Sequence, residues 1–134
     1  MRVWLYARLS NDDDREMNSL LNQREVCQAF AEQHGYIIMG QSFDDNISGM
    51  SFDRRGLDEL MAAVDADKID AVIVKDLSRL GRHRTQTALF IDYLREHQVR
   101  VISATEGVDT FRDEDDLIIG VRGLMNDYYC LLYT

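Results

Sequence analysis

Short apolar runs alternate with helical patterns along the whole chain, and this alternation limits the folds open to it. The runs are rich in β-branched or aromatic residues and cover residues 3–7, 36–39, 71–74 and 99–104. The run at 71–74 is apolar at every position, which is typical of a strand buried on both faces. Strands that alternate with helices predict an α/β fold, with a central, mostly parallel sheet and helices on both of its faces.

Helical spacing marks the segments between these runs. The first helix is expected to end at His34-Gly35, because glycine readily adopts the left-handed conformation that closes a helix. A second and a third helix are expected around residues 57–64 and 90–94. A last apolar stripe runs from Leu117 to Leu132 behind the acidic residues 113–116. This stripe predicts a long amphipathic helix that continues to the end of the chain.

Length and composition favour one domain. The chain has 134 residues, of which 46% are apolar, enough for a compact domain with its own core. Its longest apolar runs are far shorter than the roughly 20 residues of a membrane-spanning helix, and its start does not resemble a secretory signal. Cys27 and Cys130 have no metal-ligand spacing and lie in apolar helical stripes. We therefore expect a cytoplasmic protein without membrane contact and with two free, buried thiols.

The distribution of charge is uneven. The net charge is −9, whereas proteins that bind nucleic acids usually carry a basic surplus. Residues 75–84 nevertheless contain four basic side chains and one acidic side chain, a local charge of +3 in an otherwise acidic chain. The positive charge is therefore concentrated directly after the predicted strand at 71–74.

Polar residues follow three of the predicted strands. Arg8 and Ser10 come after the first strand, residues 44–49 after the second and residues 75–82 after the third. Because ligands of open parallel sheets bind beyond the carboxyl ends of the strands, these groups are expected to converge on one edge. Arg8 and Ser10 are two residues apart and point to the same side of an extended chain. Arg79 and Arg82 are spaced to lie next to each other on one helical turn.

This pattern predicts an anion site with a nucleophile beside it. The arginines can present planar forks to a phosphate, and Ser10 supplies a hydroxyl. His83 has no acidic partner in the sequence, and His34 and His97 follow helical stretches, so a Ser-His-Asp triad is not expected. In phosphoryl transfer, by contrast, positioning and cations do most of the catalysis. The sequence has neither a glycine-rich nucleotide-binding motif nor a His/Cys cluster, so no cofactor and no metal are expected.

Four ordered motifs resemble the catalytic domain of the serine recombinases, the resolvase and invertase family, and most of all its large transposon-type and integrase members. They are Tyr6-Ala7-Arg8-Leu9-Ser10, Ser19-Leu20-Leu21-Asn22-Gln23, Asp45-Asn46-Ile47-Ser48-Gly49 with Asp53-Arg54, and Asp76-Leu77-Ser78-Arg79-Leu80-Gly81-Arg82. The resemblance covers nearly the whole chain. It implies that residues 1–134 form one resolvase-like catalytic domain.

The resemblance also implies a mechanism. Ser10 would attack a DNA phosphodiester, displace a 3′ hydroxyl and form a 5′-phosphoserine link, and religation after strand exchange would need neither ATP nor a metal. The family's phosphate-binding arginines are matched by Arg8, Arg79 and Arg82, and another active-site arginine by Arg54. Polar positions that support the site are matched by Gln23, Asp45 and Ser48.

The chain departs from the family pattern before the last motif's first arginine. Small resolvases have an acid immediately before that arginine, where this chain has Ser78, so the role of the acid passes to Asp76 or disappears. The family's last helix normally continues into a basic region that meets DNA. Here the helix from about residue 114 is expected to be truncated or altered and the DNA-binding region to be absent.

These departures bear on the partners. DNA is the expected partner of the full-length protein, whereas the isolated domain is expected to bind DNA poorly and to be inactive. The apolar stripe at 117–132 predicts a homodimer through the last helix. The family resemblance implies a tetramer in the recombination complex.

Two other classes of function stay open from the residues alone. A receiver-like phospho-signalling domain also has an α/β sheet, and Asp12, Asp13, Asp76 and Lys75 would supply its acids and its lysine. The basic segment 75–84 would, however, repel the magnesium ion that such a site needs. A non-catalytic dimerisation module is the other alternative, and it would not require Ser10.

Overall fold

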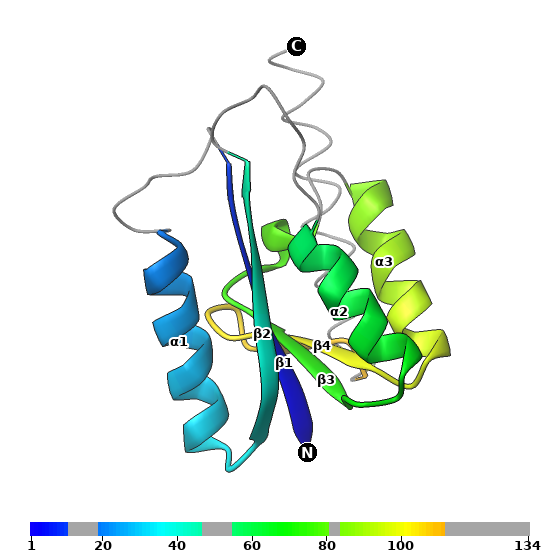
Figure 1. Cartoon of the computed structure of the whole chain (residues 1–134), viewed down its shortest axis with the longest axis horizontal. Helices are drawn as coiled ribbons and strands as arrows, with labels where there is room; N and C mark the ends of the chain where they lie inside the picture. Colours follow the sequence, from blue (N-terminus) through cyan, green and yellow to red (C-terminus); the bar gives the residue numbers. More distant parts are fainter. Residues whose placement is uncertain (11–18, 47–54, 81–83, 112–134) are drawn as a thin grey trace.

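The computed structural model of the chain describes residues 1–10, 19–46, 55–80 and 84–111 (Figure 1). A five-stranded sheet forms its centre, in the strand order β2-β1-β3-β4-β5. The strands are β1 (Arg2–Ser10), β2 (Ile37–Asn46), β3 (Ala71–Val74), β4 (Arg100–Ser103) and β5 (Val108–Asp109). The helices are α1 (Leu20–Gln33), α2 (Arg55–Asp65), the 3₁₀ helix η1 (Leu77–Arg79) and α3 (Arg84–Glu96). β1 to β4 are parallel and β5 runs antiparallel to β4, so the predicted α/β class is confirmed.

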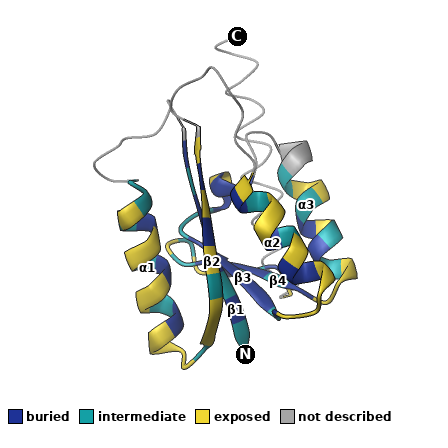
Figure 2. Ribbon diagram, viewed as in Figure 1, coloured by how far each residue is buried: buried dark blue, intermediate teal, exposed yellow. Residues whose placement is uncertain are grey.

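Helices cover both faces of the sheet, as predicted (Figures 1 and 2). α1 packs on one face, and α2 and α3 pack on the other. Successive residues of a strand point to opposite faces, so Val3 and Leu5 join the core under α1 while Tyr6 joins the core under α2 and α3. β3 is buried at every position, as expected for an interior strand. Among the described helices, none has the length and apolar composition needed to cross a membrane.

β1 and β2 extend further than the apolar runs predict. Arg8 and Ser10 lie within β1, and Asp44 to Asn46 lie within β2, whereas the sequence pattern placed them beyond the strands. The pairing runs from Arg2 opposite Ile37 to Ser10 opposite Asn46. The prediction was wrong because main-chain pairing continues through polar residues, which an apolar run does not reveal.

Two short elements were also not predicted. η1 and β5 contain three and two residues, too few to produce a periodic pattern. The amphipathic helix predicted from about residue 114 lies outside the described residues, and so does Cys130.

Both ends of α1 are capped by local contacts. The Ser19 hydroxyl accepts a hydrogen bond from the Asn22 amide at 3.0 Å. At the other end, Nδ1 of His34 lies 2.9 Å from the Phe30 carbonyl oxygen, and Gly35 has a φ of +69°. The predicted stop at His34-Gly35 is therefore confirmed. The N-terminal cap also holds Gln23, one turn into the helix, near the carboxyl end of β1.

Cys27 is the buried thiol of α1. Only 1% of its surface is exposed, in the core between α1 and the sheet. Burial, assisted by the negative charge of Asp76, raises the pKa of this thiol to about 12, while Lys75 opposes the shift. The thiol therefore stays protonated in the folded protein at neutral and mildly alkaline pH.

We predict that Cys27 is inert to thiol reagents until the protein unfolds, because these reagents react with the thiolate and need access. In a Cys130→Ser variant at about pH 8, iodoacetamide should modify Cys27 at least about 100-fold more slowly in the folded protein than in denaturant, since the raised pKa of about 12 leaves little thiolate. Mass spectrometry measures the rate. Equal rates in the two states would contradict the burial of this thiol.

Candidate active site

The main chain of β1 needs new partners where β3 ends. β3 pairs with β1 only from Val3 to Leu5, while β1 continues to Ser10. Gln23 of α1 supplies partners for Arg8: its side-chain oxygen accepts from the Arg8 amide at 3.1 Å, and its side-chain nitrogen donates to the Arg8 carbonyl at 2.8 Å. Gln23 is completely buried. Its carboxamide thus takes the place that a neighbouring strand would have along β1.

Arg79, the last residue of η1, binds the same carbonyl of Arg8. Its Nη1 donates to the Arg8 carbonyl oxygen at 2.7 Å. Its Nη2 and Nε donate to Oδ2 of Asp76 at 3.2 and 3.4 Å. Arg79 is only 4% exposed, and burial of a charge requires such hydrogen-bonded partners. The buried guanidinium is thereby held in one orientation at the end of β1.

Arg8 completes a reciprocal contact with η1. Its Nη2 donates to the carbonyl oxygen of Ser78, while Arg79 donates to the carbonyl of Arg8. Each arginine therefore binds the main chain that carries the other. Asp76 caps the N-terminus of η1, and its carboxylate accepts from the amide and the hydroxyl of Ser78 as well as from Arg79. Arg8 and Arg79 therefore both lie where the end of β1 meets η1, and the Asp76 carboxylate binds Arg79 there.

Further hydrogen bonds link η1 and the end of β3 to neighbouring elements. The Leu77 amide donates to the Glu106 carboxylate at 2.9 Å, and the Ser103 hydroxyl donates to the same carboxylate at 2.8 Å. Lys75 donates to the Asn22 side chain at 2.9 Å and so links the end of β3 to α1. Glu106 was not predicted as a site residue, because it follows β4 in a turn and belongs to none of the motifs.

The structure brings some of the predicted site residues together and leaves others undescribed. Arg8, Gln23, Asp76 and Arg79 form one connected cluster. Ser10 is the last residue of β1, two positions beyond Arg8, and its hydroxyl lies outside the described part. Three other predicted site residues also lie outside it: Ser48, Arg54 and Arg82. The predicted helical turn shared by Arg79 and Arg82 is therefore described only at Arg79, which ends η1.

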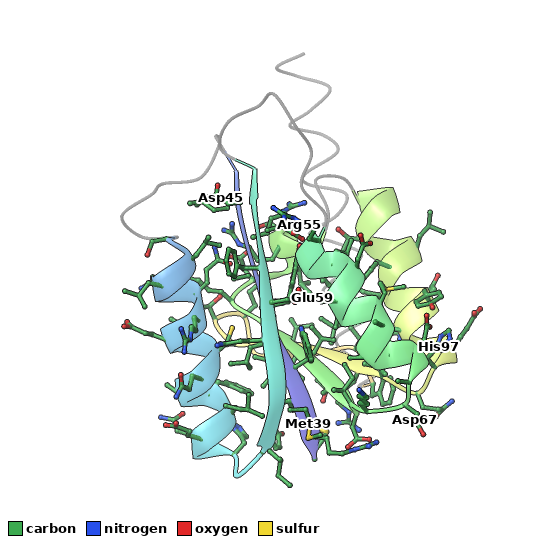
Figure 3. All side chains as sticks on the ribbon, in the orientation of Figure 1. Met39, Asp45, Arg55, Glu59, Asp67 and His97 are labelled. Atoms are coloured by element: carbon green, nitrogen blue, oxygen red, sulfur yellow. The ribbon has the colours of Figure 1, made fainter. Side chains whose placement is uncertain are left out.

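Asp45 and Asp44 have different positions on β2. Asp45, the predicted supporting residue, is exposed near the end of the strand (Figure 3). Asp44, which the sequence analysis did not select, is 2% exposed and lies opposite Arg8 in the β1–β2 register. A strand alternates its side chains between two faces, so only the register decides which of two adjacent acids is buried.

The fold and the arginine cluster define an α/β domain with Arg8 and Arg79 gathered near the carboxyl end of β1. A family model described as "Resolvase, N terminal domain" matches residues 3–133. The chain belongs to this resolvase family. The family resemblance inferred from the four motifs is therefore confirmed.

Curated relatives agree with the family match. The chain is 29% identical over 121 residues to the transposon Tn3 resolvase of Escherichia coli, covering 90% of this chain and 60% of that protein. It is 30% identical over 105 residues to the serine recombinase gin of Escherichia phage Mu, covering 78% of this chain and 48% of that protein. The chain thus spans about half to three-fifths of the length of these relatives.

Solved structures share the fold. The N-terminal catalytic domain of TP901-1 integrase superposes with a TM-score of 0.74 at 22% identity, with both chains fully covered. A resolvase family site-specific recombinase from Streptococcus pneumoniae superposes with a TM-score of 0.77 at 25% identity, over 98% of this chain and 92% of that one. The sheet and its helices are therefore those of resolvase-type catalytic domains.

We predict that Gln23→Ala destabilises the domain by about 1–3 kcal/mol, because it leaves the partly buried amide and carbonyl of Arg8 with fewer partners. Urea unfolding followed by circular dichroism measures the free energy of unfolding. Gln28→Ala, an exposed position on the same helix, serves as the matched control and should change stability by less than about 0.5 kcal/mol. A similar loss in both variants would show that Gln23 contributes only as a helix residue.

Proposed function

We propose that residues 1–134 form the catalytic domain of a site-specific DNA recombinase in which Ser10 is the nucleophile. The observation that carries this proposal is the reciprocal contact of Arg8 and Arg79 on the strand that ends at Ser10. It gathers two phosphate-binding forks around the main chain leading to a hydroxyl. Membership of the resolvase family, whose curated members include the Tn3 resolvase and the gin recombinase, supports the same function.

The proposed reaction is the transfer of a phosphoryl group from DNA to the serine. The Ser10 oxygen forms a bond to phosphorus, the bond from phosphorus to the 3′ oxygen breaks, and the serine proton ends on that departing oxygen. One phosphoester replaces another, so a 3′ hydroxyl of a different strand can reverse the step after exchange, without ATP or a metal. Arginines stabilise the charge that develops on the phosphoryl oxygens.

The site residues have different roles in this proposal. Arg8 and Arg79 bind the phosphate, and Arg82 and Arg54 add further guanidinium groups. Asp76 takes over the role of the acid that Ser78 replaces, since its carboxylate already orients Arg79. Gln23 positions Arg8 through the main chain. Asp45 and Ser48 complete the polar surroundings.

The net charge of the chain and its family membership indicate which partners to expect. DNA is the substrate of the full-length protein, where the cluster at the end of β1 meets a phosphate. A domain with a net charge of −9 is expected to bind DNA weakly by itself, because affinity for the backbone grows with the number of neutralised phosphates. We expect a homodimer through residues 117–132 and a tetramer during strand exchange, in the cytoplasm of the host cell.

The alternative functions rest on other residues. A receiver-like domain would use Asp76 for an ion, but this carboxylate instead accepts hydrogen bonds from Arg79 and Ser78. A dimerisation module would have no use for a buried arginine at the carboxyl edge of the sheet. The family match and this cluster therefore favour the recombinase.

We predict that Ser10→Ala abolishes the covalent protein–DNA species while leaving the fold intact, because only the hydroxyl oxygen is removed. The full-length protein is incubated with suicide DNA, and the adduct is followed on a denaturing gel. Gln28→Ala, at an exposed position of α1 outside the cluster, serves as the control and should still form the adduct. An adduct that survives in Ser10→Ala would refute the assignment of the nucleophile.

We predict that Arg79→Lys lowers the single-turnover rate of DNA cleavage at least about tenfold, corresponding to about 1.4 kcal/mol. A lysine keeps the charge but cannot reproduce a planar fork that binds Asp76 and the Arg8 carbonyl at once. Arg95→Lys is the control, because Arg95 binds the Thr110 carbonyl instead. Unchanged cleavage by Arg79→Lys would mean that Arg79 supports the fold alone.

A further inference from the structure

A buried carboxylate joins the start of α2 to both long strands. Oδ2 of Asp44 accepts a hydrogen bond from the Tyr6 hydroxyl at 2.7 Å and another from the Leu57 amide at 3.0 Å. Oδ1 accepts from the Gly56 amide at 2.7 Å. Asp44 is 2% exposed, so these contacts form away from water. One side chain of β2 thereby fixes the first turn of α2 to β1.

Neighbouring contacts leave this turn little freedom to shift. The Ser42 hydroxyl donates to the Gly56 carbonyl at 2.7 Å and accepts from the Trp4 indole at 2.9 Å. A Cβ at position 56 would lie 2.4 Å from the Phe43 carbonyl oxygen, so only glycine allows the helix to approach the strand this closely. The first turn of α2 is therefore held on β2 by its main chain.

The contacts of the Asp44 carboxylate with Tyr6, Gly56 and Leu57, called the Asp44 clamp from here on, lie beside the arginine cluster. Asp44 is opposite Arg8 in the β1–β2 register, and Tyr6 precedes Arg8 by two residues on the same face of β1. The helix that the clamp holds begins with Arg55, which lies at the same end of the sheet as Asp45 (Figure 3). Arg54, the additional active-site arginine of the proposed function, directly precedes Arg55 in the chain.

We propose that Asp44 is a positioning residue for the cleavage reaction: it sets the place of the start of α2, which follows Arg54 directly in the chain, relative to the strand that carries Ser10. This inference rests on the proposed function. Asp44 itself touches neither the nucleophile nor the phosphate. Its carboxylate acts through the Gly56 and Leu57 amides at the start of α2 and through the Tyr6 hydroxyl on β1.

Asp44→Asn is the variant that tests the clamp with the least change in size. A carboxamide has a single oxygen, so in either orientation its NH₂ group faces a main-chain N–H of Gly56 or Leu57. We expect the single-turnover cleavage rate of the full-length protein to fall at least about tenfold, with DNA affinity unchanged within about twofold. Tyr6→Phe, which removes one of the three donors, should have a smaller effect in the same direction.

A double-mutant cycle separates positioning from general support of the fold. If Asp44 acts through Arg54, then Asp44→Asn should cause little further loss of cleavage in an Arg54→Ala background. Asp58→Asn is the matched control, since Asp58 is an exposed acid in the same first turn of α2 and should leave the cleavage rate unchanged. Losses that multiply in the Arg54→Ala background, or cleavage at the wild-type rate by Asp44→Asn, would overturn the proposal.

A second measurement does not depend on recombination. Hydrogen exchange of the Gly56 or the Leu57 amide should be at least about tenfold faster in Asp44→Asn, because one of the two amides faces an NH₂ group in place of an oxygen. If wild-type protein formed no covalent adduct with DNA, the proposed function would fail, and exchange would still decide the clamp. Unchanged protection of both amides in Asp44→Asn would refute the proposed role of Asp44.

Discussion

The structure depends on how the main chain of Arg8 is satisfied where β1 extends past β3. The amide and the carbonyl of Arg8 form partly buried hydrogen bonds, and such groups are rarely left without partners. The carboxamide of Gln23 and the guanidinium of Arg79 provide them from two different elements. The residues that bind the main chain of β1 beyond β3 are therefore also residues of the candidate site.

This arrangement explains how an acidic chain maintains a cationic site. Arg79 is buried and would be costly without compensation, and Asp76 supplies a carboxylate three residues earlier in the chain. Arg8 donates a hydrogen bond to the Ser78 carbonyl. One carboxylate is thus shared between a buried guanidinium and the start of η1. Other acidic residues in the described part of the chain, such as Asp58 and Asp67, are exposed.

A buried polar side chain also binds β1 from the side of β2. Gln23 and Arg79 bind its main chain from α1 and η1, while Asp44 binds its Tyr6 side chain and the first turn of α2. Segments distant in the sequence are therefore brought to one strand end by polar side chains that are themselves buried. Apolar packing builds the two cores, but it does not specify where these polar ends lie relative to one another.

The sequence by itself determined the fold class and the family. Alternating apolar runs and helical patterns require a sheet covered by helices, and the motifs around Arg8, Gln23 and Arg79 carry the likeness to resolvases. Only the tertiary structure decided the roles of adjacent residues: Asp44 is buried and Asp45 exposed, because the register with β1 selects the face. The reason is physical, since local spacing sets periodicity, whereas contacts between distant segments set register and the partners of buried polar groups.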